Sequence, residues 1–144
     1  MSTVKFSCGI APSNADAVLG VEIWIDQDLV IDIDHVAQAQ TIEHQFDDNE
    51  AKRVLRIVLK NKLPEHTTVD EQGNIVTDST VTIENINMDG VVIDNAVHKL
   101  AQYWNDRNGT QTRHMDRFYG VMGCNGVVHF EFTTPTYQWL LDNV

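Results

Sequence analysis

Apolar and polar residues alternate along several short segments of the chain, and this alternation is typical of β-strands. In residues 21–26, Val21, Ile23 and Ile25 fall on one face. Residues 29–34 return with a similar pattern after a short acidic turn, as the second arm of a hairpin. Further alternating segments cover residues 4–8, 41–46 and 127–132. The pattern predicts strands that each bury one face.

Two glycine-containing turns predict consecutive β-hairpins. Gly73 lies within residues 69–76, between two arms of alternating character, and Asp89-Gly90 separates the strand after residue 81 from residues 91–93. Glycine adopts positive φ angles without a steric penalty, which tight hairpin turns need. Hairpins at this spacing indicate an antiparallel all-β domain rather than a nucleotide-binding α/β fold.

The side on which apolar residues fall changes within the strand that begins at Val81. Val81 and Ile83 share one face, whereas Ile86 and Met88 fall on the opposite parity. One extra residue in the strand restores both pairs to the same side, so the sequence predicts a β-bulge near Asn85.

Residues 53–60 allow two interpretations. Leucine and arginine favour a helix, but Leu55, Ile57 and Leu59 lie on one face of a strand, and Pro64 follows after a strand-like length. We predict a central strand here. Its opposite face would be half covered and consists of Val54, Arg56 and Val58.

The C-terminal third interrupts the alternation. Residues 96–104 carry apolar residues at helical spacing and predict a short helix or turn. Residues 105–117 are almost free of apolar side chains and predict an exposed polar loop or arm. Residues 137–141 are apolar and belong to the core or to an interface. We therefore predict one domain over residues 1–144, an antiparallel β-sandwich of jelly-roll type with a short helical or irregular C-terminal insertion.

Composition narrows the range of partners. The chain has 144 residues and a formal net charge of -11, and such a surface repels nucleic-acid phosphates. No apolar run approaches the roughly 20 residues that span a bilayer, and the first residues lack the basic and apolar regions of a signal peptide. We expect no nucleic acid and no membrane among its partners. Cys8 and Cys124 form no C-x-x-C pair; free thiols are favoured, although a disulfide between the first and last strands remains open.

Several segments together resemble a known family. They are residues 21–26 (VEIWID), 59–62 (LKNK), 70–75 (DEQGNI), 88–91 (MDGV), 130–135 (FEFTTP) and 137–141 (YQWLL). In this order they resemble small jelly-roll proteins akin to calcium-dependent xylan-binding carbohydrate-binding modules, and more closely the acidic single-domain versions encoded by tailed phages of marine cyanobacteria. The resemblance implies a virion-associated, non-enzymatic β-sandwich, assembled in the host cytoplasm.

Calcium is the metal that the acidic residues could bind. It needs six to eight oxygen ligands, several of them carboxylates. Candidate ligands gather at Asp26, Asp28, Asp32 and Asp34, although their spacing does not match an EF-hand loop. The alternative is a solvated strand face and turn, and we favour it. No cofactor is required by the sequence, and Ca²⁺ is the one candidate.

Aromatic rings offer a second kind of site, because sugar rings stack on them. The candidates for carbohydrate binding are Trp24, Tyr103 and Trp104. Trp24 has the opposite parity from Val21, Ile23 and Ile25, and so is exposed or belongs to a second buried layer. Tyr103 and Trp104 precede the polar segment; the alternative, which we favour, is that they cap the core.

The sequence carries no catalytic signature. It lacks His-x-His, His-Glu-x-x-His, Gly-x-Ser-x-Gly and a phosphate-binding glycine loop. We expect no enzyme. The leading hypothesis is a structural or interaction protein of a tailed phage virion, on the tail, baseplate or capsid surface, with other virion proteins and further copies of itself as partners. The alternative is a calcium-dependent carbohydrate-binding module that recognises a surface polysaccharide.

Overall fold

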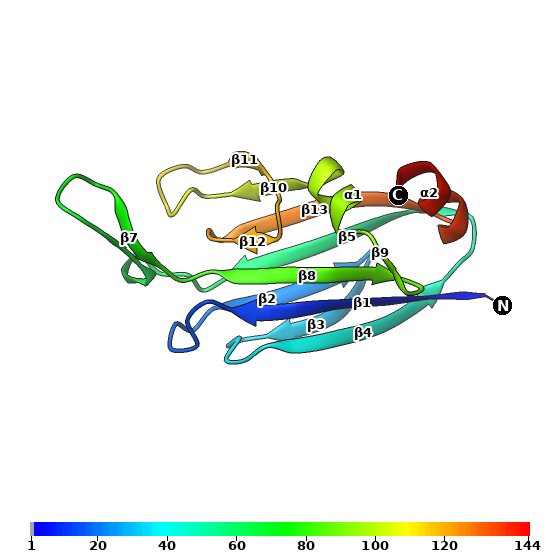
Figure 1. Ribbon diagram of the computed structural model, residues 1–144, viewed down its shortest axis with the longest axis horizontal. Helices are drawn as coiled ribbons and strands as arrows, with labels where there is room; N and C mark the ends of the chain where they lie inside the picture. Colours follow the sequence, from blue (N-terminus) through cyan, green and yellow to red (C-terminus); the bar gives the residue numbers. More distant parts are fainter. Residues whose placement is uncertain (1) are drawn as a thin grey trace.

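Strands with alternating burial form two antiparallel sheets that face each other across one core (Figure 1). A computed structural model describes residues 2–144. Sheet A has the order β12-β8-β1-β4, with β9 paired to β8. Its strands are β1 (Thr3–Pro12), β4 (Gln40–Asp47), β8 (Val81–Met88), β9 (Val91–Val92) and β12 (Val121–Met122).

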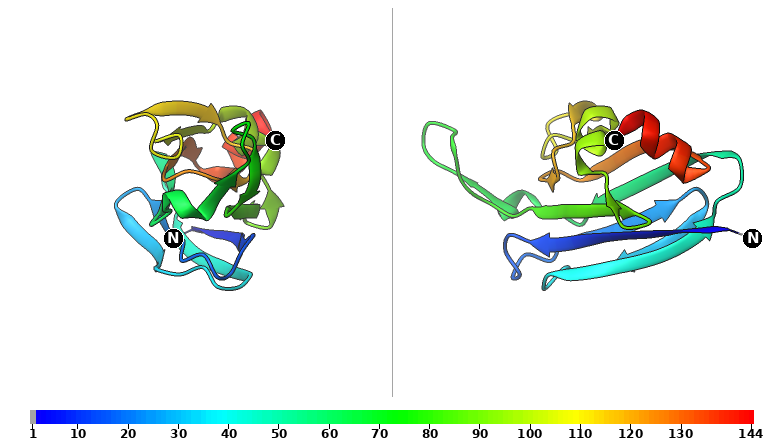
Figure 2. Two further views of the ribbon diagram at one scale, coloured as in Figure 1. Left: turned by 90° about the vertical axis from the view of Figure 1, so that its left-hand side faces the viewer. Right: turned by 45° about the vertical axis from the view of Figure 1, so that its right-hand side comes forward.

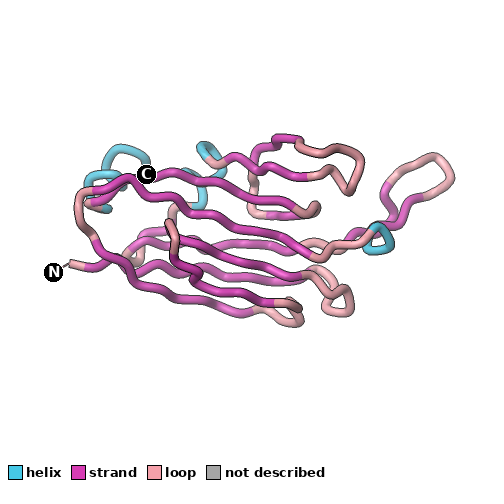
Figure 3. The backbone as a smooth tube through the Cα atoms, turned by 180° about the vertical axis from the view of Figure 1, so that it is seen from behind, coloured by secondary structure: helices cyan, strands magenta, loops and turns pink. Residues whose placement is uncertain are grey.

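Sheet B has six strands in the order β11-β10-β13-β5-β2-β3. They are β2 (Gly20–Ile25), β3 (Asp28–Ile33), β5 (Ala51–Lys60), β10 (Gln102–Asn105), β11 (His114–Arg117) and β13 (Gly126–Thr134). Most connections cross from one sheet to the other, as Figure 3 shows from behind. The prediction of an antiparallel β-sandwich with short helices is confirmed.

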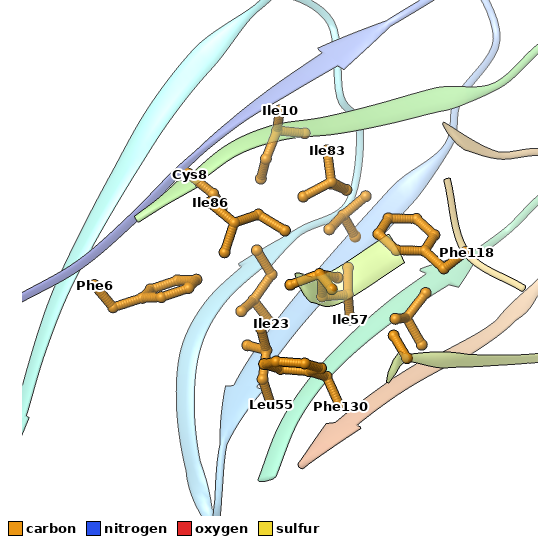
Figure 4. Packing of buried hydrophobic residues seen from close by; sticks show 14 of the residues in the cluster. Phe6, Cys8, Ile10, Ile23, Leu55, Ile57, Ile83, Ile86, Phe118 and Phe130 are labelled. Carbon is orange, nitrogen blue, oxygen red and sulfur yellow. The ribbon is translucent and has the colours of Figure 1, made fainter. Parts of the chain in front are cut away.

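The core lies between the inner faces of the two sheets (Figure 4). Phe6, Ile10 and Ile83 come from sheet A, and Leu55 and Phe130 come from sheet B; all five are almost fully buried. Burial of such side chains contributes about 25 cal/mol per Å² of apolar surface removed from water. The burial of these alternating apolar side chains is therefore the main contribution that stabilises the sandwich.

The prediction of a central strand at residues 53–60 is confirmed, because β5 pairs with β13 on one side and β2 on the other. The predicted bulge is also present. Ser7 faces Asn87 but Gly9 faces Glu84, so β8 contains one more residue than β1 at this point, and Asn85 has φ +52°. The two predicted glycine turns are confirmed, with φ +82° at Gly73 and +84° at Gly90.

Two short helices complete the C-terminal third: α1 (Asp94–Leu100) and α2 (Thr136–Asn143). Trp139 of α2 is buried, with its ring centroid 5.6 Å from that of Phe130, which settles its place in the core. Cys8 and Cys124 are both free thiols. No helix within residues 2–144 has the length and apolar character to cross a membrane.

The structure differs from the prediction of a polar loop or arm over residues 105–117. Residues 114–117 form strand β11, which pairs with β10 at the edge of sheet B, and the exposed turn between them covers residues 106–113. An edge strand needs backbone partners on one side only, and the outward side chains of β11 are solvated. The hydrophobic alternation that marks other strands is therefore absent here.

A third, two-stranded unit projects from the body (Figure 2). It consists of β6 (Thr67–Val69) and β7 (Ile75–Asp78), preceded by a 3-10 turn at Pro64–His66. We call residues 67–78 the projecting hairpin. Its apolar side chains Val69, Ile75 and Val76 are 58%, 60% and 63% exposed.

A buried ion pair fixes the base of the projecting hairpin. Lys62 Nζ lies 2.6 Å from Asp78 Oδ1 and also donates to the carbonyl oxygen of Gly123, while Thr67 Oγ1 donates to the same carboxylate oxygen at 2.6 Å. The Lys62 side chain is only 3% exposed. Desolvation alone would raise the pKa of Asp78, but the hydrogen bonds from Lys62 and Thr67 lower it.

We expect Lys62→Met to lower the free energy of unfolding by about 3 kcal/mol at neutral pH, because it leaves a partly buried carboxylate without its cation. The pKa of Asp78 is lower in the folded protein, so the pair contributes above the unfolded value of 3.8 and its contribution is lost as pH falls through the folded value. Urea unfolding at neutral and acid pH measures both effects. The control Lys5→Met removes an exposed pair, which contributes at most about 1 kcal/mol. Equal destabilisation by the two variants would contradict the prediction.

Candidate functional site

The outer face of sheet B carries a band of side chains that points away from the core. Strand pairing aligns them in two rows across β10, β13, β5 and β2. The first row consists of Trp104, Val127, Val58 and Glu22. The second row consists of Gln102, His129, Arg56 and Trp24. We call these eight residues the outer panel. All of them are partly or fully exposed.

Trp24 lies at one corner of the outer panel. The alternation of β2 buries Val21, Ile23 and Ile25 and turns Trp24 to the opposite side, where it is half-buried. Its indole Nε1 donates to Glu22 Oε1 at 3.0 Å. The guanidinium of Arg56, from the adjacent strand, lies 5.4 Å from the ring centroid. Trp24 is therefore held on the surface, in contact with a cation.

Trp104 occupies the diagonally opposite corner. Its Nε1 donates to Gln102 Oε1 at 3.3 Å, and the guanidinium of Arg113 lies 4.1 Å from its ring centroid. Gly126 allows β10 to lie this close to β13: a Cβ at that position would come within 2.1 Å of the Trp104 carbonyl oxygen. The turn of residues 106–113 places Arg113 over the ring.

The two corners form a matched arrangement. Each tryptophan donates to the side chain two residues before it, and each has an arginine beside its ring. Three strand spacings and a shift of two residues separate Trp24 from Trp104, which is roughly 16 Å between Cα atoms. This separation suits an extended ligand with several units better than a single small molecule.

A shallow hollow of about 410 Å³ borders the outer panel on the side of α1. Leu100, Gln102, His129 and Glu131 line it, and His129 Nε2 lies 3.3 Å from Glu131 Oε1. The hollow therefore offers hydrogen-bonding groups of several kinds next to the aromatic rings.

Tyr103 does not belong to this surface, and its assignment as a sugar-stacking residue is corrected by its burial. It is 5% exposed because it follows Gln102 and precedes Trp104 on β10, so it faces the core. Its hydroxyl donates to the Cys124 carbonyl and accepts from the Cys124 amide at 3.0 Å. Burial also raises the pKa of Tyr103. Its ring serves packing.

The four candidate calcium ligands lie along the β2–β3 hairpin, but most of them already have cationic partners. Asp26 Oδ2 is 2.9 Å from Arg53 Nη1. Asp32 Oδ1 and Asp34 Oδ1 are 2.5 and 3.7 Å from Lys60 Nζ.

Asp28, at the start of β3, is exposed. In the described residues, 2–144, no group of three or more His, Cys, Asp or Glu side chains is placed to hold a metal ion. The hydrogen bond with Asp32 raises the pKa of Lys60, so this lysine remains a cation beside the carboxylates. Asp26, Asp32 and Asp34 neutralise the cations Arg53 and Lys60 of β5.

Sequence reasoning did not identify the arginines, the histidine or the glutamine of this surface as site residues. Arg56 was recognised only as part of the half-covered face of β5. The sequence shows on which side of its strand each of Arg56, His129 and Gln102 falls. It does not show the order of the strands in sheet B, and this order brings these residues beside the tryptophans.

Comparison with known proteins shows a likeness to a solved structure. No family model matches the chain. No curated protein matches it either. A solved structure described as vCBM60 in complex with galactobiose is similar, with 13% sequence identity and a TM-score of 0.47. The alignment covers 88% of this chain and 96% of that chain.

Because Asp26, Asp32 and Asp34 have cationic partners, we expect the melting temperature to be the same in millimolar calcium and in chelator. Differential scanning fluorimetry measures it. Lys60→Met serves as the comparison, since it frees the carboxylates of Asp32 and Asp34. A calcium-dependent rise in the wild-type protein would instead establish a calcium site and contradict the prediction.

Proposed function

We propose that this protein is a non-catalytic polysaccharide-binding module that uses the outer panel. The observation that carries the proposal is the placement of Trp24 and Trp104 at opposite corners of one solvent-facing sheet surface. Aromatic rings present large, rigid apolar faces, and their indole N–H groups add directional contacts. A sugar ring has apolar C–H faces and polar edges, so it matches this combination.

The side chains between the tryptophans support the same conclusion. Val58 and Val127 supply an apolar floor along the first row, while Gln102, His129 and Arg56 supply donors and acceptors along the second. A sheet face with a partly exposed ring at each of two opposite corners accommodates a chain of sugars lying across the strands.

We expect Trp24→Ala and Trp104→Ala each to weaken binding about tenfold or more, as removal of a tryptophan anchor commonly does. A glycan array, run with calcium and with chelator, identifies the ligand, and calorimetry then measures the affinity. Tyr137→Ala is the matched control, because Tyr137 is an exposed aromatic residue on α2, outside the panel.

Three outcomes of this experiment have distinct meanings. Loss of binding in both tryptophan variants, with Tyr137→Ala unchanged, supports the proposal. Binding that survives both substitutions would place the sugar site elsewhere. Failure of the wild-type protein to bind any glycan on the array, with or without calcium, would reject the proposed function.

A second candidate function, a repeating subunit of a phage particle, is favoured by the two ends of the molecule. The projecting hairpin exposes apolar side chains at one end, and α2 lies toward the other (Figure 1). Tyr137, Leu141 and Val144 share one face of α2 and its cap and are 65%, 79% and 63% exposed. Contact between the hairpin of one copy and α2 of the next would be head-to-tail, and such contacts produce rings or filaments.

For this second candidate we expect concentration-dependent association of the wild-type protein, and monomers when either Val76→Asp or Leu141→Asp is introduced. Sedimentation analysis measures the size distribution. A mixture of the two variants retains one intact hairpin and one intact α2, so it should form dimers and nothing larger. Val92→Asp, on the exposed strand β9, is the control. A wild-type protein that stays monomeric at every concentration would rule the assembly out.

A further inference from the structure

The cations of this acidic protein fall into two groups. Four of the ten Lys and Arg side chains form ion pairs with Asp or Glu, namely Lys5, Arg53, Lys60 and Lys62. Among the described residues, the other six form none; they are Lys52, Arg56, Lys99, Arg107, Arg113 and Arg117. Three of these six are arginines on or beside the outer panel. In a chain with 21 carboxylates, this concentration on one face calls for an explanation.

The contacts that these three arginines make leave donors available. Arg56 lies over Trp24 and donates to the Asp26 carbonyl oxygen at 3.2 Å. Arg117 donates to the Lys99 carbonyl oxygen at 3.0 Å, and Arg113 lies over Trp104. A guanidinium has five N–H donors, and stacking on a ring uses its face rather than those donors. Each arginine can therefore still bind a planar or tetrahedral anion through two parallel hydrogen bonds.

Arg113 also determines what a ligand must supply. It belongs to the exposed turn of residues 106–113, and a sugar that stacks on Trp104 has to displace it from the indole. A neutral sugar would remove the cation–π contact and give the guanidinium nothing in return. A sugar with a carboxylate or sulfate group would give Arg113 a stronger partner than the one it loses.

We propose that the ligand of the outer panel is an anionic polysaccharide, whose carboxylate or sulfate groups bind Arg56, Arg113 and Arg117. This inference rests on the proposed polysaccharide-binding function and specifies its ligand class. Arg56 and Arg113 accompany tryptophans at opposite corners, and Arg117 lies opposite Gln102 on the edge strand. The acidic groups would therefore recur along the bound chain. These three cations attract a polyanion to this face, although the net charge of the whole chain is -11.

The test uses polymers that share a backbone and differ in charge. Dextran, carboxymethyl-dextran and dextran sulfate form one series, and polygalacturonate with its methyl ester forms a second. Binding is measured by biolayer interferometry at low and high salt. We expect the charged polymers to bind, the neutral ones to bind at least tenfold more weakly, and added salt to weaken binding. The carboxymethyl and sulfate arms distinguish the two kinds of anion.

Variants separate specific recognition from a general effect of charge. Arg56→Gln and Arg113→Gln should each weaken binding of the charged polymers about tenfold, the usual effect of losing a hydrogen bond to a charged group. Lys5→Gln changes the net charge by the same amount on sheet A and should leave affinity within about twofold. Unchanged melting temperatures confirm that the variants are folded.

The outcomes that would overturn the inference differ from those that would reject the proposed function. If neutral and charged polymers bind equally, or if Arg113→Gln strengthens binding of a neutral glycan by uncovering Trp104, the ligand is neutral and the polysaccharide-binding proposal still stands. If Lys5→Gln weakens binding as much as the arginine variants do, recognition is non-specific and the inference fails. If none of the five polymers binds, the inference fails, while the glycan array decides the wider proposal.

Discussion

The pairing of β5 with β13 and with β2 is the interaction on which the rest of this structure depends. Nine residue pairs join β5 to β13 and six join it to β2, so the strand is fixed along its whole length. Its inward residues Leu55, Ile57 and Leu59 are fully buried, while Arg56 and Val58 form the centre of the outer panel. A shift of one residue in register would exchange these two sets. The free energy of core burial therefore also fixes the surface.

This coupling explains how the outer face of sheet B keeps a defined arrangement of polar groups. The side chains of the outer panel lie beside one another across the paired strands. A long side chain such as Arg56 would sample many conformations if nothing held it. Contact with the Trp24 ring and the Asp26 carbonyl oxygen restricts Arg56. Binding to a side chain that is already restricted costs less conformational entropy than binding that must first order the side chain.

The distribution of charge gives the molecule two different surfaces. Lys60 and Arg53 neutralise carboxylates of the β2–β3 hairpin and its neighbours, and they stabilise the fold locally. Arg56, Arg113 and Arg117 bind backbone carbonyls and indole rings instead. The chain as a whole nevertheless has a net charge of -11. The Lys62–Asp78 pair serves a third purpose, since it stabilises the base of the projecting hairpin.

The sequence by itself determined most of the strands, because their alternating burial is a local pattern. It located the bulge near Asn85 and the turns at Gly73 and Gly90. For Trp24 it left two alternatives, an exposed ring or a ring in a second buried layer. It did not show which of Tyr103 and Trp104 is buried. Both are aromatic, and the answer depends on which face of β10 packs against the core. Strand β11 lacked a signal because an edge strand with solvated outer side chains has no hydrophobic pattern.

Only the tertiary structure decided which residues form a site. Trp24 and Trp104 are 80 positions apart in the chain, and strand order brings them onto one face with Arg56 between. Pairing of distant strands depends on the free energy of the whole core, which no short segment encodes. The same reason applies to the aspartates of residues 26–34. The sequence shows them close together, but the cationic partners of Asp26, Asp32 and Asp34 come from β5, and only the fold brings them there.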